Sequence, residues 1–307
     1  MSSIMTNSAA MTALKSLQAT NQALETTQAR ISTGLRVGEA SDNAAYWSIA
    51  TTMRSDNKAL GSVQDALGLG AAKADVAYTG INSAIDVVDE IKSKLVAARE
   101  PGVDKAKIQS EIGELQNQLT SIATSASFSG ENWLSQDSSA SGYSATKEVV
   151  ASFNRAADGT VSVGTVDIDT SAIKLFDAAG GASGILDTTF TTTGAGNVTV
   201  SVSNLDITAA NFDDTDLDDM ISQVDSAISS MTTAASDIGS SKGRIDMQND
   251  FVSNLMDAID RGIGALVDAD MTKESTRLSA LQTQQQLGTQ ALAIANGSAQ
   301  SILSLFR

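Results

Sequence analysis

The residues of this chain whose types could do chemistry are mainly carboxylates, because 36 of its 307 residues are Asp or Glu and none is His or Cys. The densest group is the run DDTDLDD at 213–219, whose alternating acids are similar to the start of a calcium-binding loop. Such a loop needs glycine at its sixth position and a bidentate glutamate at its twelfth. Counted from Asp214, those positions are Asp219 and Asp225, so both requirements fail. The run is better explained as the acidic first turn of a helix, where the helix dipole favours negative charge.

Composition excludes most other side-chain chemistry. Without histidine there is no Ser-His-Asp triad and no imidazole metal ligand, and without cysteine there is no thiol nucleophile, zinc finger or disulfide framework. The glycine-rich stretch 180–184 lacks the spacing and the Lys-Ser/Thr ending of a phosphate-binding loop. We therefore predict no catalytic, cofactor-binding or metal-binding residues, no cofactor and no enzymatic activity. The remaining enzyme alternative is a carboxylate-based hydrolase, which needs two carboxyl groups about 5–9.5 Å apart in a pocket.

The distribution of charge indicates which surfaces are meant to be covered. The net charge of −16 argues against nucleic acid or an anionic membrane as the main partner. Residues 1–40 carry a net charge of +1 and residues 265–307 carry none, whereas residues 41–264 carry −17. No segment approaches the roughly 20 apolar residues that span a bilayer, and the N-terminal segment lacks the features of a cleaved secretory signal. We expect the two nearly neutral ends to be covered by protein, and any export to proceed without a cleaved leader.

Apolar residues recur at alternating spacings of three and four over most of the chain, which is the pattern of helices that pack along a seam. Pro101 and Gly102 end one such stretch, and so short a connection makes the flanking helices antiparallel neighbours. The pattern predicts a mainly α fold, an elongated antiparallel helical bundle (rod) with coiled-coil-like paired terminal helices and a small β-rich outer insertion. The residues expected to pack within the rod are Leu60, Val63, Leu67, Ile81, Val88, Ile91, Leu95, Ile108, Leu115, Leu119, Ile221, Val224, Ile228, Ile238, Ile245, Val252 and Ile259.

The chain ends repeat the pattern with weaker apolar residues, and from residue 278 to residue 306 no side chain is charged. Ordering about 40 residues costs on the order of 40–80 kcal/mol of backbone entropy, whereas about eight buried aliphatic side chains return on the order of 20 kcal/mol. We therefore hypothesise that both ends become ordered only among neighbouring copies of the chain. The residues expected to form this self-assembly core are Ile4, Met11, Leu14, Leu17, Leu24, Ile31, Leu35, Leu278, Leu281, Leu292, Ile302 and Phe306.

The period changes between residues 141 and 212, where β-branched, partly alternating segments are separated by glycine-rich turns. We expect five segments: an N-terminal filament-core helix at 1–40, rod helices at 41–140, a β-rich variable outer lobe at 141–212, a rod helix at 213–264 and a C-terminal filament-core helix at 265–307. Two tryptophans, Trp47 and Trp133, lie near the ends of the predicted rod helices. We interpret both as caps of the apolar interior rather than as a ligand platform.

Three stretches resemble known sequences. RISTGLRVGEASDNAAYWSIA at 30–50 resembles the N-terminal signature of bacterial flagellins, and SFSGENWL at 127–134 resembles the segment that closes the second core helix of that family. Residues 268–307, which end in LSLFR, resemble the flagellin C-terminal helix. Both ends are present in the family's order, with a variable insertion between them. The resemblance implies a non-enzymatic subunit that self-assembles helically into the flagellar filament for swimming motility.

The resemblance also implies partners and a location. It implies a homo-polymer, with mixing with related flagellins left open, in a secreted, extracellular bacterial flagellum. It further implies an export chaperone at the C-terminal helix, the flagellar export apparatus, and hook-associated and cap proteins, with no nucleic acid and no membrane. The alternative within the same group of proteins is a hook–filament junction (hook-associated) protein, which shares the terminal helices but does not propagate. Growth on added seeds separates the two.

Two further positions follow from the resemblance. Flagellins that the animal innate receptor senses carry an arginine inside a Leu-Gln-Arg-Val-Arg-Glu run. The comparable run here is LVAARE at 95–100, so Ala97 takes the equivalent position, whereas Glu111, in an Ile-Gln-x-Glu-Ile context, matches the family. We hypothesise that this chain is a weak or silent ligand of that receptor.

Overall fold

The computed structural model describes residues 7–180 and 182–305, with side chains up to residue 297. The chain forms two compact units, one built from Met1–Lys58 with Met256–Arg307 and the other from Ala59–Leu255. The predicted class is confirmed, because long helices dominate and the strands are short and few within the part of the chain that the structure describes. Two long helices, α2 (Ala44–Ala97) and α4 (Asp214–Val267), contribute residues to both units.

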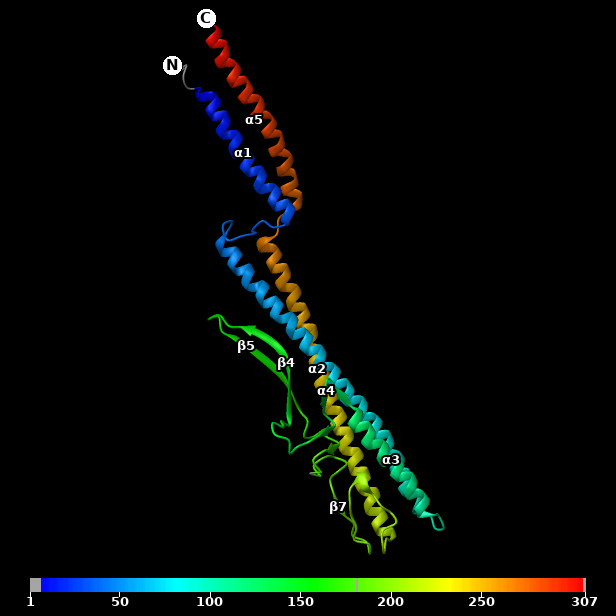
Figure 1. The fold of residues 1–307 in the computed structure, drawn as a ribbon. Coiled ribbons are helices and arrows are strands. Elements are labelled where there is room, and N and C mark those ends of the chain that lie inside the picture. The colour runs from blue at the N-terminus through cyan, green and yellow to red at the C-terminus, as the bar shows by residue number, and fades with distance from the viewer. Residues whose placement is uncertain (1–6, 181, 306–307) are drawn as a thin grey trace. The chain divides into compact units, whose positions relative to one another are not determined.

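The first unit pairs the two ends of the chain. Helix α1 (Ser8–Thr33) lies beside α5 (Met271–Leu305) in Figure 1, where α1 is blue and α5 is orange to red. Asn7 is the N-cap of α1, since its side chain accepts a hydrogen bond from the Ala10 backbone N–H at 3.0 Å. Gly34 ends the helix with φ of 72°, a left-handed conformation that glycine adopts without steric cost.

In the second unit, α3 (Lys105–Ser125) runs beside α2 and α4 (Figure 1). Asp104 caps the N-terminus of α3 through a hydrogen bond from the Ala106 N–H, as its position after the Pro-Gly break predicts. The interior is built from apolar residues at the seam spacings, so the burial pattern follows the 3-4 periodicity of the sequence. Thirteen of the seventeen residues expected to pack there are buried, and the four that are only half-buried are Leu115, Ile221, Ile228 and Ile259.

On α4 the buried stripe differs from the predicted seam by one position at two places. Met220 and Ala227 are 0% and 3% exposed, whereas the expected Ile221 and Ile228 are half-buried. Strand-rich residues also pack on this helix near the first of these places, because the Thr193 N–H donates to Asp219 and the Gly196 N–H donates to Asp216. A helix covered from two sides buries a wider stripe than a two-residue seam contains.

The described residues of the strand-rich part form four two-stranded sheets. Its largest element is the antiparallel hairpin of β4 (Thr146–Arg155) and β5 (Val161–Asp169). The shorter pairs are β1 (Ser127–Phe128) with β2 (Glu131–Asn132), β3 (Ser135–Gln136) with β6 (Phe176–Asp177), and β7 (Phe190–Thr191) with β8 (Thr199–Val200), followed by a 3-10 turn at Val202–Asn204. Strand pairing therefore begins at residue 127, earlier than the alternating sequence segments indicate.

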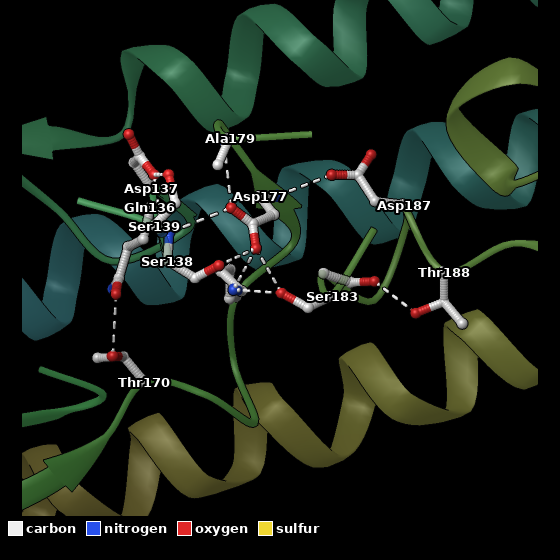
Figure 2. A network of polar contacts seen from close by, with 12 residues as sticks. Gln136, Asp137, Ser138, Ser139, Thr170, Asp177, Ala179, Ser183, Asp187 and Thr188 are labelled. Carbon is white, nitrogen blue, oxygen red and sulfur yellow. Dashed lines mark hydrogen bonds and ion pairs between the residues drawn. The ribbon is translucent and has the colours of Figure 1, made fainter. Parts of the chain in front are cut away.

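A polar network around Asp177 holds the shorter strands together (Figure 2). The Asp177 carboxylate accepts hydrogen bonds from the hydroxyl groups of Ser138 and Ser183, both at 2.5 Å. It also forms an ion pair with Lys174 at 3.1 Å. The two hydroxyl donors, the Ser138 N–H and the Lys174 ammonium keep the pKa of Asp177 far below its usual range, although burial opposes them. The backbone N–H of Asp177 in turn donates to Asp187 at 2.7 Å. The carboxylate of Asp177 is therefore held ionised in an interior that charged groups rarely occupy unless paired.

Candidate self-assembly surface

A short backbone junction sets where the two terminal helices meet. Leu35 forms an antiparallel bridge with Asp268, and the Ala269 N–H donates to the Gly34 carbonyl at 2.8 Å. The Arg36 guanidinium donates to the Leu266 carbonyl at 2.8 Å, which satisfies one of the last carbonyls of α4. These contacts join the segment after α1 to the segment before α5, so the two helices leave the junction side by side.

The junction rests on a small apolar cluster. Val37, Ala50, Ile263 and Val267 are all under 9% exposed, and the partly buried residues packed against them are Leu35, Met53, Ile259 and Leu266. Two of the predicted residues, Leu35 from the self-assembly set and Ile259 from the rod set, therefore lie in one cluster of the first unit.

One face of α1 packs on one face of α5. Thr27 of α1 is 2% exposed and Leu281 of α5 is 9% exposed, and a Cβ atom added to Gly288 would lie 3.2 Å from Leu17 Cδ1. The other predicted residues on this seam, each half-buried, are Leu24, Ile31, Leu278 and Leu292. Glycine at position 288 therefore permits close approach of the two helices.

Polar contacts fix the register of this pair. The Asn7 amide donates to the Ala295 carbonyl at 2.9 Å, and the Gln285 amide donates to the Asn21 side chain at 2.8 Å. Arg30 forms an ion pair with Glu274 at 3.5 Å, and the Glu274 side chain is only 9% exposed. Because these contacts link positions more than 240 residues apart, they specify which turn of α1 faces which turn of α5.

The other faces of both helices also carry apolar side chains, and these are exposed. Met11 and Leu14 of α1 are 55% and 45% exposed, and Leu287 and Ile294 of α5 are 58% and 72% exposed. Met11 and Leu14 were expected in the seam with neighbouring copies, and here they lie away from the α1–α5 contact. Leu287 and Ile294 were missed because they fall between the seam positions counted on α5. We call these four residues the outer apolar face of the pair.

A helix that is apolar on two sides is normally buried on two sides. Among the described residues of the first unit, α1 is the helix that packs on α5, and residues 278–306 contain no charge that would favour exposure to water. Burying a large aliphatic side chain fully contributes about 1.5–3 kcal/mol, so covering the outer apolar face is a strong driving force for association.

The first turns of α2 add large apolar side chains, two of them aromatic, to the exposed surface of this unit. Tyr46, Trp47 and Ile49 are 42%, 37% and 49% exposed. The interpretation of Trp47 as a cap of the apolar interior is therefore wrong, because Ala50 takes the buried position of that turn instead. Trp133, the other tryptophan, is 3% exposed and does occupy the interior.

The remaining predicted positions are placed as follows. Ile4 and Phe306 lie outside the described residues, and Ile302 lies in α5 beyond the last described side chain. Ala97 is exposed at the last residue of α2. Glu111 forms an ion pair with Lys94 at 2.7 Å.

The acidic run has a structural role that its spacing alone did not reveal. As predicted, it is the first turn of α4, with Asp214 and Asp216 in that turn. Asp219 accepts the Thr193 N–H at 2.6 Å, and Asp216 accepts the Gly196 N–H at 2.9 Å, so the run holds the turn between β7 and β8. The Thr192 hydroxyl beside the carboxylate, together with backbone N–H groups, lowers the pKa of Asp216 to about 2.

The described residues contain no group of three or more Asp or Glu side chains arranged to hold a metal ion. Among the same residues, none of the helices combines the length and the hydropathy that crossing a bilayer requires.

Comparisons with known proteins show which sequences this chain is similar to. The family model of the bacterial flagellin N-terminal helical region matches residues 4–139, and that of the C-terminal helical region matches residues 221–306. The chain is 55% identical over 322 aligned residues to Flagellin C of Rhizobium meliloti strain 1021, with both chains covered completely. It is 48% identical over 398 residues to Flagellin A of the same strain and 47% identical over 310 residues to a flagellin of Brucella melitensis biotype 1, again with complete coverage of both chains.

Proposed function

The chain belongs to the bacterial flagellin family, whose members are structural subunits of the helical flagellar filament, and from this premise we propose that the α1–α5 pair is the surface through which its copies assemble. The observation that carries the proposal is the second apolar face of α5, which lies in the stretch from residue 278 onward that carries no charge. Leu287 and Ile294 are exposed on α5, while its opposite side is already used by α1. No observation favours the alternative of a hook–filament junction protein.

We propose a structural role for each of the five expected segments of the chain. Residues 1–40 and 265–307 are the filament-core helices, residues 41–140 and 213–264 form the surrounding helical domain, and residues 141–212 form the outer lobe. The near-zero net charge of the two ends supports the first assignment, and the acidic net charge of the middle supports its contact with water. The chain is proposed to have no enzymatic activity, which agrees with its lack of histidine and cysteine and with the structural role of its family.

Further partners of this chain are proposed from the family. Self-polymerisation in an extracellular filament follows from membership. We propose in addition that the chain reaches the filament through the flagellar export apparatus, with a chaperone on the C-terminal helix, and that it contacts hook-associated and cap proteins. Because Flagellin A and Flagellin C of one strain are both relatives of this chain, mixed filaments with related flagellins are included in the proposal.

We also propose weak recognition by the animal innate receptor. Ala97 leaves an exposed site at the end of α2 without the guanidinium group that sensed flagellins carry, and the matching Glu111 is engaged by Lys94. Purified monomer is expected to give a low signal in a receptor reporter assay, and Ala97→Arg is expected to raise it. Strong signalling by the unmodified monomer contradicts this part of the proposal.

The assembly proposal is tested by placing a charge on the outer apolar face. Leu287→Asp and Ile294→Asp change exposed side chains, so the monomer should keep its helix content and melting temperature. In the filament each carboxylate would be buried without a partner, which costs several kcal/mol per subunit, and seeded growth should stop. Sedimentation and electron microscopy of protein incubated with filament fragments measure the outcome.

The matched control is Val103→Asp, which places the same charge on an apolar side chain that is 40% exposed in the loop between α2 and α3. The control should polymerise as the unmodified chain does. Normal filament growth by Leu287→Asp and Ile294→Asp would show that α5 is not an assembly surface.

A further inference from the structure

The inner face of the β4–β5 hairpin leaves a space beside α4. Val166 lies on this face and is 6% exposed, and two positions before it Gly164 pairs with Ser152. Because side chains alternate along a strand and paired residues share a face, Gly164 and Ser152 belong to the same inner face. Glycine has no side chain and that of serine is short, so the hairpin does not fill the space there. A cavity of about 390 Å³ lies between this pair and Arg244 and Gln248 of α4.

A second cavity of about 300 Å³ continues the first along the same two elements. It is lined by Asp169 at the end of β5 and by Asp237 of α4, and Arg244 lines both cavities. A strand advances about 17 Å between residues 164 and 169, and a helix advances about the same distance between residues 237 and 248. The equal lengths indicate that β5 and α4 line one continuous cleft, which we call the hairpin cleft.

One end of the hairpin cleft presents hydrogen-bond donors. Arg244 is exposed, and its guanidinium group has no hydrogen-bond or ion-pair partner among the residues that the structure describes. The same holds for the side-chain amide of Gln248 and the hydroxyl group of Ser152, which line this end with it. No Asp or Glu of the described residues lines the cavity at this end. A guanidinium group with further donors beside it suits a carboxylate, which can accept two parallel hydrogen bonds from arginine.

The other end of the hairpin cleft is acidic. Asp237 is exposed, and its side chain forms no hydrogen bond or ion pair within the part of the chain that the structure describes. Asp169 lines the same end, and the hydroxyl group and the N–H of Ser171 donate to its carboxylate and keep its pKa below the usual value. This end therefore suits a positively charged group such as a primary ammonium.

The spacing of the two ends limits the ligand. Asp237 and Arg244 lie seven residues apart on one face of α4, so they are about 10 Å apart along the helix axis. Hydrogen bonds of about 3 Å at each end leave roughly 5 Å between the two charged groups of a ligand that contacts both. The charged side chains that line the cleft are one arginine and two aspartates, a net charge of −1, which disfavours a simple anion. The guanidinium group likewise disfavours a simple cation.

We infer that the hairpin cleft binds a small amino carboxylate whose ammonium and carboxylate groups are separated by a short methylene chain. The carboxylate accepts hydrogen bonds from Arg244 and Gln248, and the ammonium donates to Asp237. The methylene chain lies against Val166 and Ile168, buried apolar residues that line the cleft between its ends. An α-amino acid is too short to reach both ends, whereas three methylene groups match the spacing. This inference goes beyond the filament role and does not depend on the α1–α5 surface.

Three probes of equal chain length test the binding on the full-length monomer. They are 4-aminobutanoate, butanoate and butylamine, which carry both charges, only the carboxylate and only the ammonium. A chemical-shift titration by nuclear magnetic resonance should show saturable binding of 4-aminobutanoate, about fivefold tighter than that of either singly charged probe. The inference is overturned if 4-aminobutanoate does not bind saturably, or if butanoate or butylamine binds as tightly.

Two single variants place the ligand in the cleft. With Arg244→Gln, 4-aminobutanoate should bind no more tightly than butylamine, and with Asp237→Asn its advantage over butanoate should fall to about twofold or less. The matched control is Lys107→Gln, which removes a charge from an α3 side chain that is 83% exposed and should leave all three affinities unchanged. Circular dichroism establishes that each variant folds, and the probe comparison on the unmodified chain stands without them. A variant of Arg244 or Asp237 that folds and binds the probes as Lys107→Gln does overturns the inference. Filament growth is not measured here, so the outcome is independent of Leu287→Asp.

Discussion

Replacing Gly70 by alanine should weaken the packing of the β4–β5 hairpin on α2. Gly70 lies within α2, and a Cβ atom built on it would overlap Val149 Cγ1 and lie 2.9 Å from Cγ2 and 3.2 Å from Cβ of the same residue. Carbon atoms attract best at about 3.5–4.0 Å, so all three atoms are too close. Valine is branched at Cβ and stiff at χ1, and rotating one methyl away brings the other in. The strand must therefore move.

The magnitude follows from two opposing effects. Overpacking a tight contact costs about 1–3 kcal/mol, whereas alanine in a helix interior gains about 0.8–1 kcal/mol over glycine. The net expectation for Gly70→Ala is a loss of about 1–2 kcal/mol in the free energy of unfolding. Gly68 is the matched control, because it lies in the same helix and a Cβ atom there meets nothing within 4 Å. Gly68→Ala should gain about 0.5–1 kcal/mol.

Urea unfolding followed by far-ultraviolet circular dichroism measures both variants. The double variant Gly70→Ala/Val149→Ala removes the overlapping methyl groups, so its loss should be smaller than the sum of the two single losses. If Gly70→Ala proves as stable as Gly68→Ala, the close packing of the hairpin on α2 is not what the contact geometry indicates.

Three further predictions concern other parts of the chain. Because the folded pKa of Asp216 is lowered to about 2 from the usual value near 3.9, the stability that it contributes is present above about pH 4 and is lost as the pH falls through 2; the protection of the Gly196 amide against hydrogen exchange, taken relative to the intrinsic exchange rate at each pH, should fall over that range, and less so in Asp216→Asn. Asp177→Ala should destabilise the second unit by about 3–5 kcal/mol, measured by urea unfolding, because it leaves the Lys174 ammonium buried without its carboxylate. Trimming residues 1–40 and 265–307 should remove little helix from the circular dichroism spectrum of the soluble monomer if the ends are ordered only by neighbouring copies; a large loss contradicts that hypothesis.

Much of the fold could be predicted from the sequence because its helices follow a regular 3-4 pattern. The buried residues of α2, such as Leu67, Ile81 and Leu95, are those that the spacing selects, and the break at Pro101 does separate two neighbouring helices. The pattern was less accurate where a helix packs on more than one neighbour. On α4 the fully buried position is Met220 rather than Ile221, in a stretch where the turn of the strand-rich part at 193–196 also contacts the helix through Asp216 and Asp219.

The contacts of the strand-rich part could not be predicted, because they join residues far apart in sequence. No local pattern marks Lys174 as a buried cation, and its partners Asp177 and Ser183 are recognisable only once the strands are placed. The β-bulge between Val150 and Ser152 is equally invisible, because it appears only once the pairing register of β4 with β5 is known.

The proposed assembly surface shows why a seam pattern alone misplaces residues in a polymer subunit. A heptad count assumes one partner and one stripe, and on α1 it assigned Met11 and Leu14 to the same seam as Leu24 and Ile31. The structure divides them, with Leu24 and Ile31 half-buried and Met11 and Leu14 exposed. A helix that must contact its own chain and a second chain needs two stripes, which fill the circumference and weaken the periodicity of each. The more reliable sequence signal of the second stripe was the absence of charge, because a surface meant for water would carry it.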